Sequence, residues 1–466
     1  MVCPPVRLLL IAAVVSFCSN WQFAFQITYV NTSVQTFYQL ANAGYQSVQR
    51  FLLTPWLTNK YGVKKTQIVT CISAVVGCGV HFLAEVVTSG GDTAVSAVLI
   101  VGRFLVGIQS GSSLCLLPLY IIEISPVQHR AFLSTFQQVS QATGTLLGLL
   151  LGSEEILPLG ANRFVWLQVF AVAPTILFLA VLLLTPTTPH QLAKRAEAKG
   201  KDNTDKISSS LMFYHGSTTE MEMIRKECHE AEDQIDQKKG IPRASWKGFA
   251  IGAAAAASYA FTADDLVDTF SAQILSKSQS EKGKMTTDSA DIMSVAFGAL
   301  LLISSLFGTV LIDRFGRRKL LLLGLVGSAL SNALVVAFSS NFIVVTAAFS
   351  FTKIFIGLGA GAPAWFLTSE LVDPAHHSLF QSLSTGILLT STMLVTFFFL
   401  QLDLLIGSYS ILALASGPAL ILAFFLYLFL PETKDKTISE VQLLLTENTF
   451  SGFPKKKRKS PMYGTL

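Results

Sequence analysis

The sequence carries little charge. Only 14% of its 466 residues are Asp, Glu, Lys or Arg, whereas 51% are hydrophobic and the mean hydropathy is +0.53. A soluble globular domain is about one-quarter charged. The composition therefore predicts a membrane protein that crosses the bilayer several times. The net charge of +5 is only weak support for a nucleic-acid partner, and we expect none.

Signatures of metal, redox and enzyme chemistry are also missing. The six cysteines show no C-x-x-C spacing, and most lie in apolar runs, so they indicate neither a metal site nor a disulfide framework. No phosphate-binding loop accompanies the apolar segments, which leaves ATP-driven pumping unsupported. No nucleophile and base stand in a recognisable catalytic arrangement. We therefore expect no cofactor and no enzymatic activity, and the sequence implies no oligomer.

What the chain has in abundance is long apolar runs. A run of about 20 apolar residues spans a bilayer as a helix. Twelve such spans can be delimited, at residues 6–30, 40–58, 66–87, 94–123, 131–153, 164–185, 247–272, 290–312, 319–339, 342–370, 379–402 and 405–430. The sequence thus predicts an all-α membrane protein with twelve transmembrane helices.

The first span has an alternative interpretation. Residues 1–19 contain one Arg, an apolar run and small residues, a pattern that signal peptides share with first membrane helices. The apolar character continues through Trp21–Val30, which favours a first helix that is not cleaved off.

Positive charge follows alternate spans. Lys and Arg stay on the cytoplasmic side of a membrane protein, and here they gather before span one and after spans two, four, six, eight and twelve. Both chain ends are therefore expected in the cytoplasm. The same pattern divides the chain into a six-helix bundle at 1–185, a cytoplasmic loop with short helices at 186–246, a second six-helix bundle at 247–430 and a cytoplasmic tail at 431–466.

Three landmarks recur in the two halves. They are a basic turn that begins with Gly, an acid that closes a span and is followed by Pro, and a Pro-Thr motif: Gly62–Lys65 with Gly316–Lys319, Glu123–Pro126 with Glu370–Pro374, and Pro186–Pro189 with Pro431–Lys434. The partners lie about 245 to 254 residues apart. Three matches in register predict two pseudo-symmetric bundles. Parallel repeats of this kind place a solute site near the midplane between the halves.

The duplicated halves and the long middle loop resemble the major facilitator superfamily. Within it, the chain resembles the facilitative hexose transporters (the GLUT-type sugar porter branch). The residues that carry this likeness are Gly102–Arg130, Asp313–Arg318, Trp365–Glu370, Pro431–Glu440 and Gln22–Asn31. The resemblance covers nearly the whole chain. It implies facilitated diffusion of a hexose or similar small polar solute by alternating access, in the plasma membrane.

The resemblance also implies networks of charged residues that close the cytoplasmic side. The candidates in this sequence are Arg103, Glu123, Arg130, Asp313, Arg314, Arg317, Arg318 and Glu370. Bundles that separate in every cycle need contacts of moderate strength, and exposed ion pairs contribute roughly 0–1 kcal/mol each. The alternative is that these charges only fix the orientation of the helices.

For the solute, the resemblance implies contacts with Gln138 and Trp365. Further candidates are Gln26, Gln137, Gln141 and Asp265. Amides and aromatic rings suit a sugar, because its hydroxyl groups need donors and acceptors and its ring faces stack on aromatic side chains. Other family ligands are absent. The seventh span reads Ser258–Thr262 instead of Gln-Gln-Leu-Ser, and the family's polar positions in spans eight and eleven fall near Leu301, Leu388 and Leu389. The solute's identity therefore stays open.

Charged residues appear within the second-half spans instead. Asp264, Asp265 and Asp268 lie in the outer part of span seven, and Lys353 lies about a third of the way into span ten. Charges inside a membrane pair with one another or mark a solute pathway. We expect Lys353 to pair with one of these acids and the others to meet a polar or cationic solute. In the alternative interpretation the aspartates are solvated at the extracellular mouth.

Coupling to protons needs an acid in the transport path. Related proton symporters have an aspartate in the first helix where this chain has Gln26, which favours uncoupled transport. Two alternatives remain. One is a proton-coupled symporter of a non-sugar or cationic solute, and the other is a transporter-derived nutrient sensor. Asn31-Thr32-Ser33 is a glycosylation sequon at the outer end of span one, which makes Asn31 a candidate acceptor.

Overall fold

The computed structural model describes residues 4–32, 58, 60–86, 92–153, 157, 163–193, 204–217, 241–278, 287–434, 436 and 438–446. Within these ranges the chain forms helices and no strand. The expected second span, at 40–58, lies outside them except for its last residue. Each of the other eleven expected spans coincides with a described helix or with a broken one.

The described ranges of the first half contain seven main helices, and the last of them follows the expected sixth span. They are α1 (Val6–Thr32), α4 (Val63–Val86), α5 (Asp92–Ile124), α6 (Val127–Ser134), α7 (Phe136–Gly152), α8 (Arg163–Leu184) and α10 (Thr204–His215). The helix α1 packs against α5, α7 and α8, and α4 packs against α5 and α8.

The second half repeats this pattern with more interruptions. Its elements are α12 (Arg243–Ala260), α13 (Asp264–Ser278), α14 (Thr287–Phe315), α15 (Arg317–Ala337), α16 (Phe342–Phe355), η5 (Ile356–Ala360), α17 (Gly361–Leu371), η6 (Pro374–His376), α18 (His377–Ile406), α19 (Tyr409–Ile411), η7 (Leu412–Ser416), α20 (Gly417–Phe429) and α21 (Ile438–Thr446). Nine helical stretches in the described ranges are long and apolar enough to cross a bilayer.

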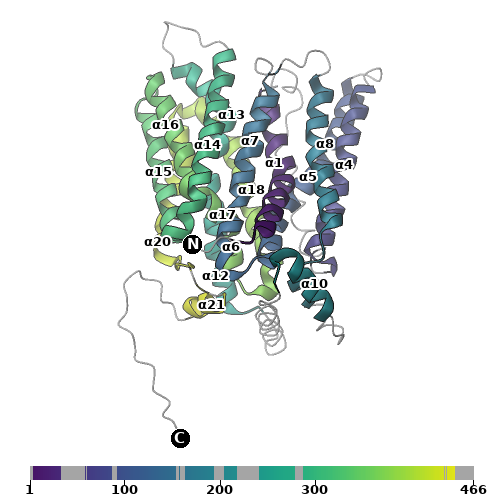
Figure 1. Cartoon of the computed structure of the whole chain (residues 1–466). Coiled ribbons are helices and arrows are strands. Elements are labelled where there is room, and N and C mark those ends of the chain that lie inside the picture. The colour runs from purple at the N-terminus through teal and green to yellow at the C-terminus, as the bar shows by residue number, and fades with distance from the viewer. Residues whose placement is uncertain are drawn as a thin grey trace, which may run out of the picture.

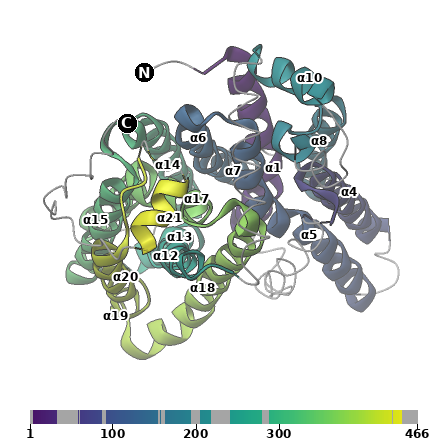
Figure 2. The same ribbon diagram turned by 90° about the horizontal axis from the view of Figure 1, so that it is seen from below.

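The helices gather into two bundles that stand side by side (Figure 1). Figure 2, seen from below, has α1, α4, α5 and α8 in one group and α12 to α20 in the other. The helices α7 and α14 meet along the boundary between them. Each bundle has apolar cores of its own, and a further buried cluster takes Leu114 and Ala142 from the first half and Trp365 from the second. The centre of the molecule is thus a surface shared by both halves.

Several of the expected spans are interrupted, and two of these interruptions lie in the spans that carry the buried charges. The seventh breaks between α12 and α13, where Ala263 adopts a φ of 70°. The carbonyl of Thr262 at this break accepts a hydrogen bond from Asn332 Nδ2 of α15, at 3.0 Å. The tenth contains the π-helical turn η5, and such turns are frequent at functional sites. The prediction of one continuous helix at 247–272 is therefore wrong, because an uninterrupted helix cannot contain a residue with the left-handed backbone conformation of Ala263.

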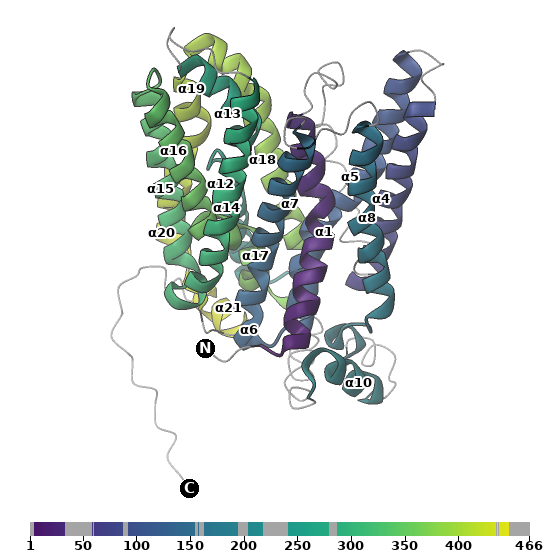
Figure 3. The same ribbon diagram turned by 45° about the horizontal axis from the view of Figure 1, so that its top comes forward.

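One end of the molecule carries the short helices. The helices α6, α10 and α21 all lie at the lower end of Figure 3, and α13 and α19 lie at the upper end. The helix α10 belongs to the polar segment 186–246, yet its Tyr214 is buried in the apolar core of the first bundle, and its Leu211 packs against Ala193 of the same segment. The Tyr214 hydroxyl lies 3.0 Å from the hydroxyl of Tyr120 on α5 and donates to the Pro186 carbonyl at 2.9 Å. We call this lower end the α10–α21 face.

Candidate solute site and gate residues

A hydrogen bond joins the two halves at the centre of the molecule. The indole Nε1 of Trp365, on α17, donates to Oε1 of Gln138, on α7, at 2.8 Å. Both side chains are almost fully buried, at 2% and 1% exposure. The sequence places Gly361 opposite Gln138, and a Cβ there would lie 2.5 Å from the Gln138 Cδ. The glycine therefore leaves room for the amide, and the two best candidates from the sequence meet directly.

The other glutamines of α7 lie in the same region with part of their hydrogen-bonding capacity unused. Gln137 Nε2 donates to the Leu114 carbonyl at 3.4 Å, and both Gln137 and Gln141 are buried. Among the described residues, no protein atom bonds Gln137 Oε1, Gln138 Nε2 or Gln141 Oε1. A buried donor or acceptor left without a partner costs about 1–3 kcal/mol. These atoms are therefore suited to the hydroxyl groups of a polar solute.

Aromatic and aliphatic side chains complete this region. The ring of Tyr259 lies 5.1 Å from that of Trp365, and Phe23 meets Trp365 edge-on at 6.4 Å. Leu301, Leu388 and Leu389, near which the resemblance leads us to expect polar ligands, belong to the same buried apolar cluster as Trp365. The site thus combines amides, mainly from the first half, with rings and apolar surface from the second.

The charges of spans seven and ten form one cluster. Lys353 is fully buried, and its Nζ donates to Oδ1 of Asp264 and Oδ1 of Asp268, each at 2.6 Å, and to the Asp264 carbonyl at 3.1 Å. The lysine therefore pairs with two acids, whereas the sequence predicted one. Asp264 is buried, so the interpretation as a solvated residue is wrong for it. Asp265 is half-buried.

Tyr259 connects this cluster to the central site. Its hydroxyl donates to Oδ2 of Asp264 at 2.5 Å, while its ring packs against Trp365. An unbroken series of contacts therefore runs from Gln138 through Trp365 and Tyr259 to Asp264 and Lys353. The sequence analysis did not single out Tyr259. A tyrosine five residues before the first aspartate, in a helix of small residues, was the available signal.

The acids that close the fourth span of each half have matching partners. In the second half, Arg317 Nη2 lies 3.2 Å from Oε1 of Glu370, and Thr433 Oγ1 donates to Oε2 at 2.6 Å. In the first half, Thr188 Oγ1 donates to Oε2 of Glu123, also at 2.6 Å. The repeat seen in the sequence thus extends to individual hydrogen bonds. Neither threonine was expected at the gate, although both stand in the repeated Pro-Thr motif.

The basic turns of the two halves also correspond. Gly62 and Gly316 both have a positive φ, of 83° and 86°, which glycine adopts without strain. A polar side chain supports each turn: Gln191 Nε2 donates to the Tyr61 carbonyl at 3.2 Å, and Glu432 Oε1 accepts from the Arg317 amide at 3.0 Å.

The remaining gate candidates have other surroundings. Arg318 donates to the Tyr427 carbonyl at 2.5 Å and stacks over that ring, and Arg314 is exposed. Arg130 is buried. Burial lowers the pKa of His129, on α6, and the charge of Asp313, on α14, opposes this shift. The helices α6 and α14 pack against each other, so this pair of charges lies between the two bundles near the α10–α21 face.

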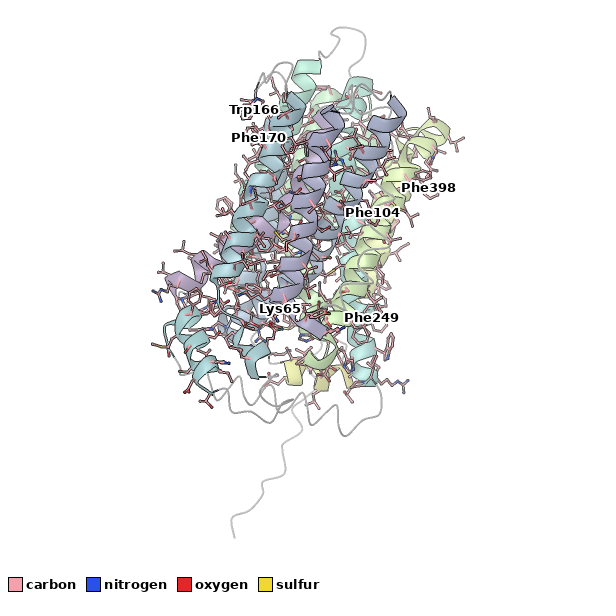
Figure 4. The ribbon with its side chains drawn as sticks, turned by 90° about the vertical axis from the view of Figure 1, so that its right-hand side faces the viewer. Lys65, Phe104, Trp166, Phe170, Phe249 and Phe398 are labelled. Carbon is pink, nitrogen blue, oxygen red and sulfur yellow. The ribbon has the colours of Figure 1, made fainter. Side chains whose placement is uncertain are left out.

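Arg103 does not belong to this gate. It lies 20 residues before Glu123 on the continuous helix α5, a rise of about 30 Å. Its Nη1 donates instead to Oε1 of Gln26, at 2.8 Å. Figure 4 places Phe104, the next residue, well above Lys65 at the lower end. The prediction that Arg103 helps close the cytoplasmic side is therefore wrong. Arg103 and Glu123 belong to one sequence motif, but they lie at different levels of the helix.

Asn31 lies in the last turn of α1, and the structure does not describe its side chain. Gln381, on α18, was not singled out, yet its Nε2 donates to the Trp365 carbonyl at 2.8 Å. An amide inside an otherwise apolar span was the only signal for it. No three His, Cys, Asp or Glu side chains in the described ranges are placed to hold a metal ion.

Known proteins resemble the chain over most of its length. A family model described as "Sugar (and other) transporter" matches residues 8–445. Facilitated glucose transporter protein 1 of Caenorhabditis elegans is 27% identical over 403 residues, which are 84% of this chain and 76% of that protein. Facilitated glucose transporter member 1 of solute carrier family 2, from Gallus gallus, is 25% identical over 402 residues, 82% and 77% of the two chains.

Solved structures share the fold. The major facilitator proton:xylose symporter XylE, bound to 6-bromo-6-deoxy-D-glucose, superposes with a TM-score of 0.79 at 18% identity, over 94% of this chain and 98% of that one. A double-tryptophan mutant of XylE gives 0.83 at 18% identity, over 95% and 100%. The two bundles therefore have the major facilitator fold, as the sequence predicts.

Proposed function

The chain belongs to the sugar transporter family of integral membrane proteins, and from this premise we propose that it carries a hexose or a similar small polar solute. Transport is by facilitated diffusion with alternating access. The relatives named above are facilitated glucose transporters by name, which supports this class of solute.

The observation that carries the proposal is the bond between Gln138 and Trp365. It joins an amide of one half to an indole of the other at the level where parallel-repeat transporters bind solute. Gln137, Gln138 and Gln141 offer unused donors and acceptors, and Trp365 with Tyr259 offers ring faces. Hydroxyl groups and the apolar face of a sugar ring match this combination.

Two arrangements support an uncoupled mechanism and a neutral solute. Arg103 contacts the amide of Gln26, which cannot release a proton at physiological pH. Lys353 uses three donors on Asp264 and Asp268, so it partly neutralises these acids and is itself fully engaged. Asp265 remains a candidate solute contact. These features disfavour the symporter of a cationic solute.

The orientation and the gate belong to the same proposal. In this proposal the protein lies in the plasma membrane, and its α10–α21 face is on the cytoplasmic side. The two bundles extend over residues 1–185 and 247–430, as the charge pattern predicts. Glu123 with Thr188, and Glu370 with Arg317 and Thr433, hold the helix ends of each bundle together. Arg130, Asp313, Arg314 and Arg318 complete the charged rim at this end. Asn31 is the candidate glycosylation acceptor at the opposite end.

Solute uptake tests this function directly. The full-length protein is reconstituted in proteoliposomes, and uptake of radiolabelled D-glucose, L-glucose and a set of polyols is measured with and without a pH gradient. We expect saturable, stereoselective uptake that the pH gradient does not drive. A chain that moves no hexose or polyol would contradict the proposal and favour a sensor, and accumulation driven by the pH gradient would favour a symporter.

A further inference from the structure

Gln381 lies beside Trp365 and bonds its backbone, whereas Gln138 bonds its indole ring. Its Nε2 donates to the Trp365 backbone carbonyl at 2.8 Å, whereas the Trp365 indole donates to Gln138 at 2.8 Å. One tryptophan is therefore held by two glutamines, one from each half of the chain. Gln381 is 2% exposed.

One end of this amide is not used by the protein. Among the described residues, no atom bonds Gln381 Oε1, although it is buried. Gln138 Nε2, the free end of the other glutamine, is in the same condition. An acceptor from the second half and a donor from the first thus stand unsatisfied on two side chains that bond the same tryptophan, one at its backbone and one at its indole. Such pairs are what the hydroxyl groups of a solute require, since each hydroxyl both donates and accepts.

The position of Gln381 faces the boundary between the bundles. Thr385 lies one turn further along α18, on the same helix face, and accepts from Gln381 Nε2 at 3.5 Å. The Thr385 hydroxyl in turn contacts the thiol of Cys115, on α5 of the first half. Movement of the two halves relative to each other therefore changes the surroundings of Gln381.

Other second-half amides are engaged elsewhere. Asn332 bonds the Thr262 carbonyl and accepts from Thr352, and Asn341 caps α16. The positions where the family has polar ligands in spans eight and eleven are Leu301 and Leu388, both buried. In the described part of the second half, Gln381 is the amide that adjoins Trp365 with an unused atom.

We propose that Gln381 is a solute contact and determines specificity: its Oε1 accepts a hydrogen bond from one hydroxyl of the solute, while Gln138 binds another. This rests on the proposed function. It supplies the second-half polar contact that the leucines at the family positions cannot make, and it sets that contact about two turns of α18 nearer to the α10–α21 face.

The test pairs variants with deoxy analogues. Gln381→Met keeps the side-chain length and removes the hydrogen bonds. For D-glucose uptake we expect KM to rise roughly 3- to 10-fold with Vmax nearly unchanged, as the loss of one hydrogen bond implies. For one monodeoxy-glucose, the analogue that lacks the recognised hydroxyl, the variant and the wild type should have the same KM.

Two more variants make the result decisive. Gln67→Met is the matched control. Gln67, on α4, is a buried glutamine whose side chain has no hydrogen-bond partner among the described residues. The helix α4 packs mainly against α5 and α8 of the first half, away from Trp365. Gln67→Met should change no KM. Gln381→Asn keeps an amide but shortens the side chain by one methylene, so it should raise the KM for D-glucose and leave the KM for the same deoxy analogue unchanged. If Gln381→Met is poorly folded by gel filtration, this second variant carries the test.

The outcomes separate the two proposals. If the wild type transports hexoses but KM does not depend on residue 381, or rises equally for every deoxy analogue, Gln381 is not a solute contact. If the wild type moves no polyhydroxylated solute, the proposed function fails first, and the role of Gln381 falls with it.

Discussion

At the scale of single residues, the central bond between Gln138 and Trp365 makes the most direct prediction. Gln138→Ala removes a solute contact and leaves the buried Trp365 Nε1 without its partner. The penalty of about 1–3 kcal/mol corresponds to a loss in kcat/KM of roughly 5- to 150-fold. Initial rates of D-glucose uptake measure it. Gln67→Ala, which removes a buried amide outside the site, should retain wild-type uptake, and equal losses in both variants would contradict a specific role for Gln138.

Lys353 is the second case at this scale. Lys353→Met leaves the buried carboxylates of Asp264 and Asp268 without a counter-charge. Breaking a buried ion pair from one side costs about 3–5 kcal/mol. We therefore expect a clear fall in the thermal unfolding midpoint of the detergent-solubilised protein.

The compensated variant is the control for Lys353. Lys353→Met combined with Asp264→Asn and Asp268→Asn has no unpaired charge and should regain most of the lost stability. If Lys353→Met alone unfolds at the wild-type temperature, the three residues do not form a stabilising cluster.

The pairing of Lys353 could be predicted from the sequence, because a charge inside a membrane span must find a partner. Its choice of two acids could not. Asp264 and Asp268 are four residues apart on one face of α13, and the break at Ala263 directs that face toward α16. Gln381 was not predicted for a different reason: the resemblance places the polar contacts of this helix near Leu388 and Leu389.

At the scale of secondary-structure elements, the close approach of helices around η5 depends on glycine. A Cβ on Gly359 would lie 2.2 Å from the carbonyl oxygen of Leu320 on α15. Gly359→Ala must therefore move α15 away from η5, and overpacking of this kind costs typically about 1–3 kcal/mol. A lower thermal unfolding midpoint in detergent is the expected result.

Gly79 on α4 provides the comparison for Gly359. No heavy atom lies within 4 Å of a Cβ built there, so Gly79→Ala meets no steric barrier. Alanine also has the better helix propensity by roughly 1 kcal/mol. We expect Gly79→Ala to leave the midpoint unchanged or raised. If both alanine variants behave alike, contact at η5 is not what limits stability.

Helix positions were the most predictable part of the fold, because about 20 apolar residues in succession have few alternatives in a bilayer. The interruptions were not predictable. The break before Asp264 depends on Asn332, 70 residues away, which bonds the freed carbonyl of Thr262. No local pattern near Ala263 reports that partner, since neither glycine nor proline marks the break.

At the scale of the whole molecule, the duplication proved informative down to individual hydrogen bonds. Thr188 and Thr433 bond Glu123 and Glu370 with the same length of 2.6 Å. Each of these bonds, and the bond between Arg317 and Glu370, joins residues of the same half of the chain. They make each bundle rigid at the α10–α21 face, which is what a rocking movement of two bodies requires. The wrong prediction for Arg103 also arises at this scale, because the length of α5 separates Arg103 from Glu123 although both belong to one sequence motif.

Cys115 offers a way to observe the rocking movement. It is fully buried where α5 meets α18, so separation of the bundles on the α10–α21 side would expose it. Glu370→Gln weakens the bond to Arg317, which fixes the end of α17, a helix that packs against α5 and α7 of the first bundle. In a variant whose other cysteines are replaced by serine, we expect N-ethylmaleimide to modify Cys115 roughly 2- to 5-fold faster after this change, as the loss of one partly exposed ion pair implies.

Cys71 distinguishes opening of the bundles from general loosening. It is equally buried, but it lies in the core of the first bundle, where its thiol donates to the Thr175 carbonyl. A parallel variant that keeps only Cys71 should react slowly with and without Glu370→Gln, because movement of rigid bundles leaves their interiors closed. Faster modification of Cys71 together with Cys115 would mean that the substitution loosens the protein as a whole, and not only the boundary between the bundles. Unchanged reactivity of Cys115 would mean that Glu370 does not hold the α10–α21 side shut.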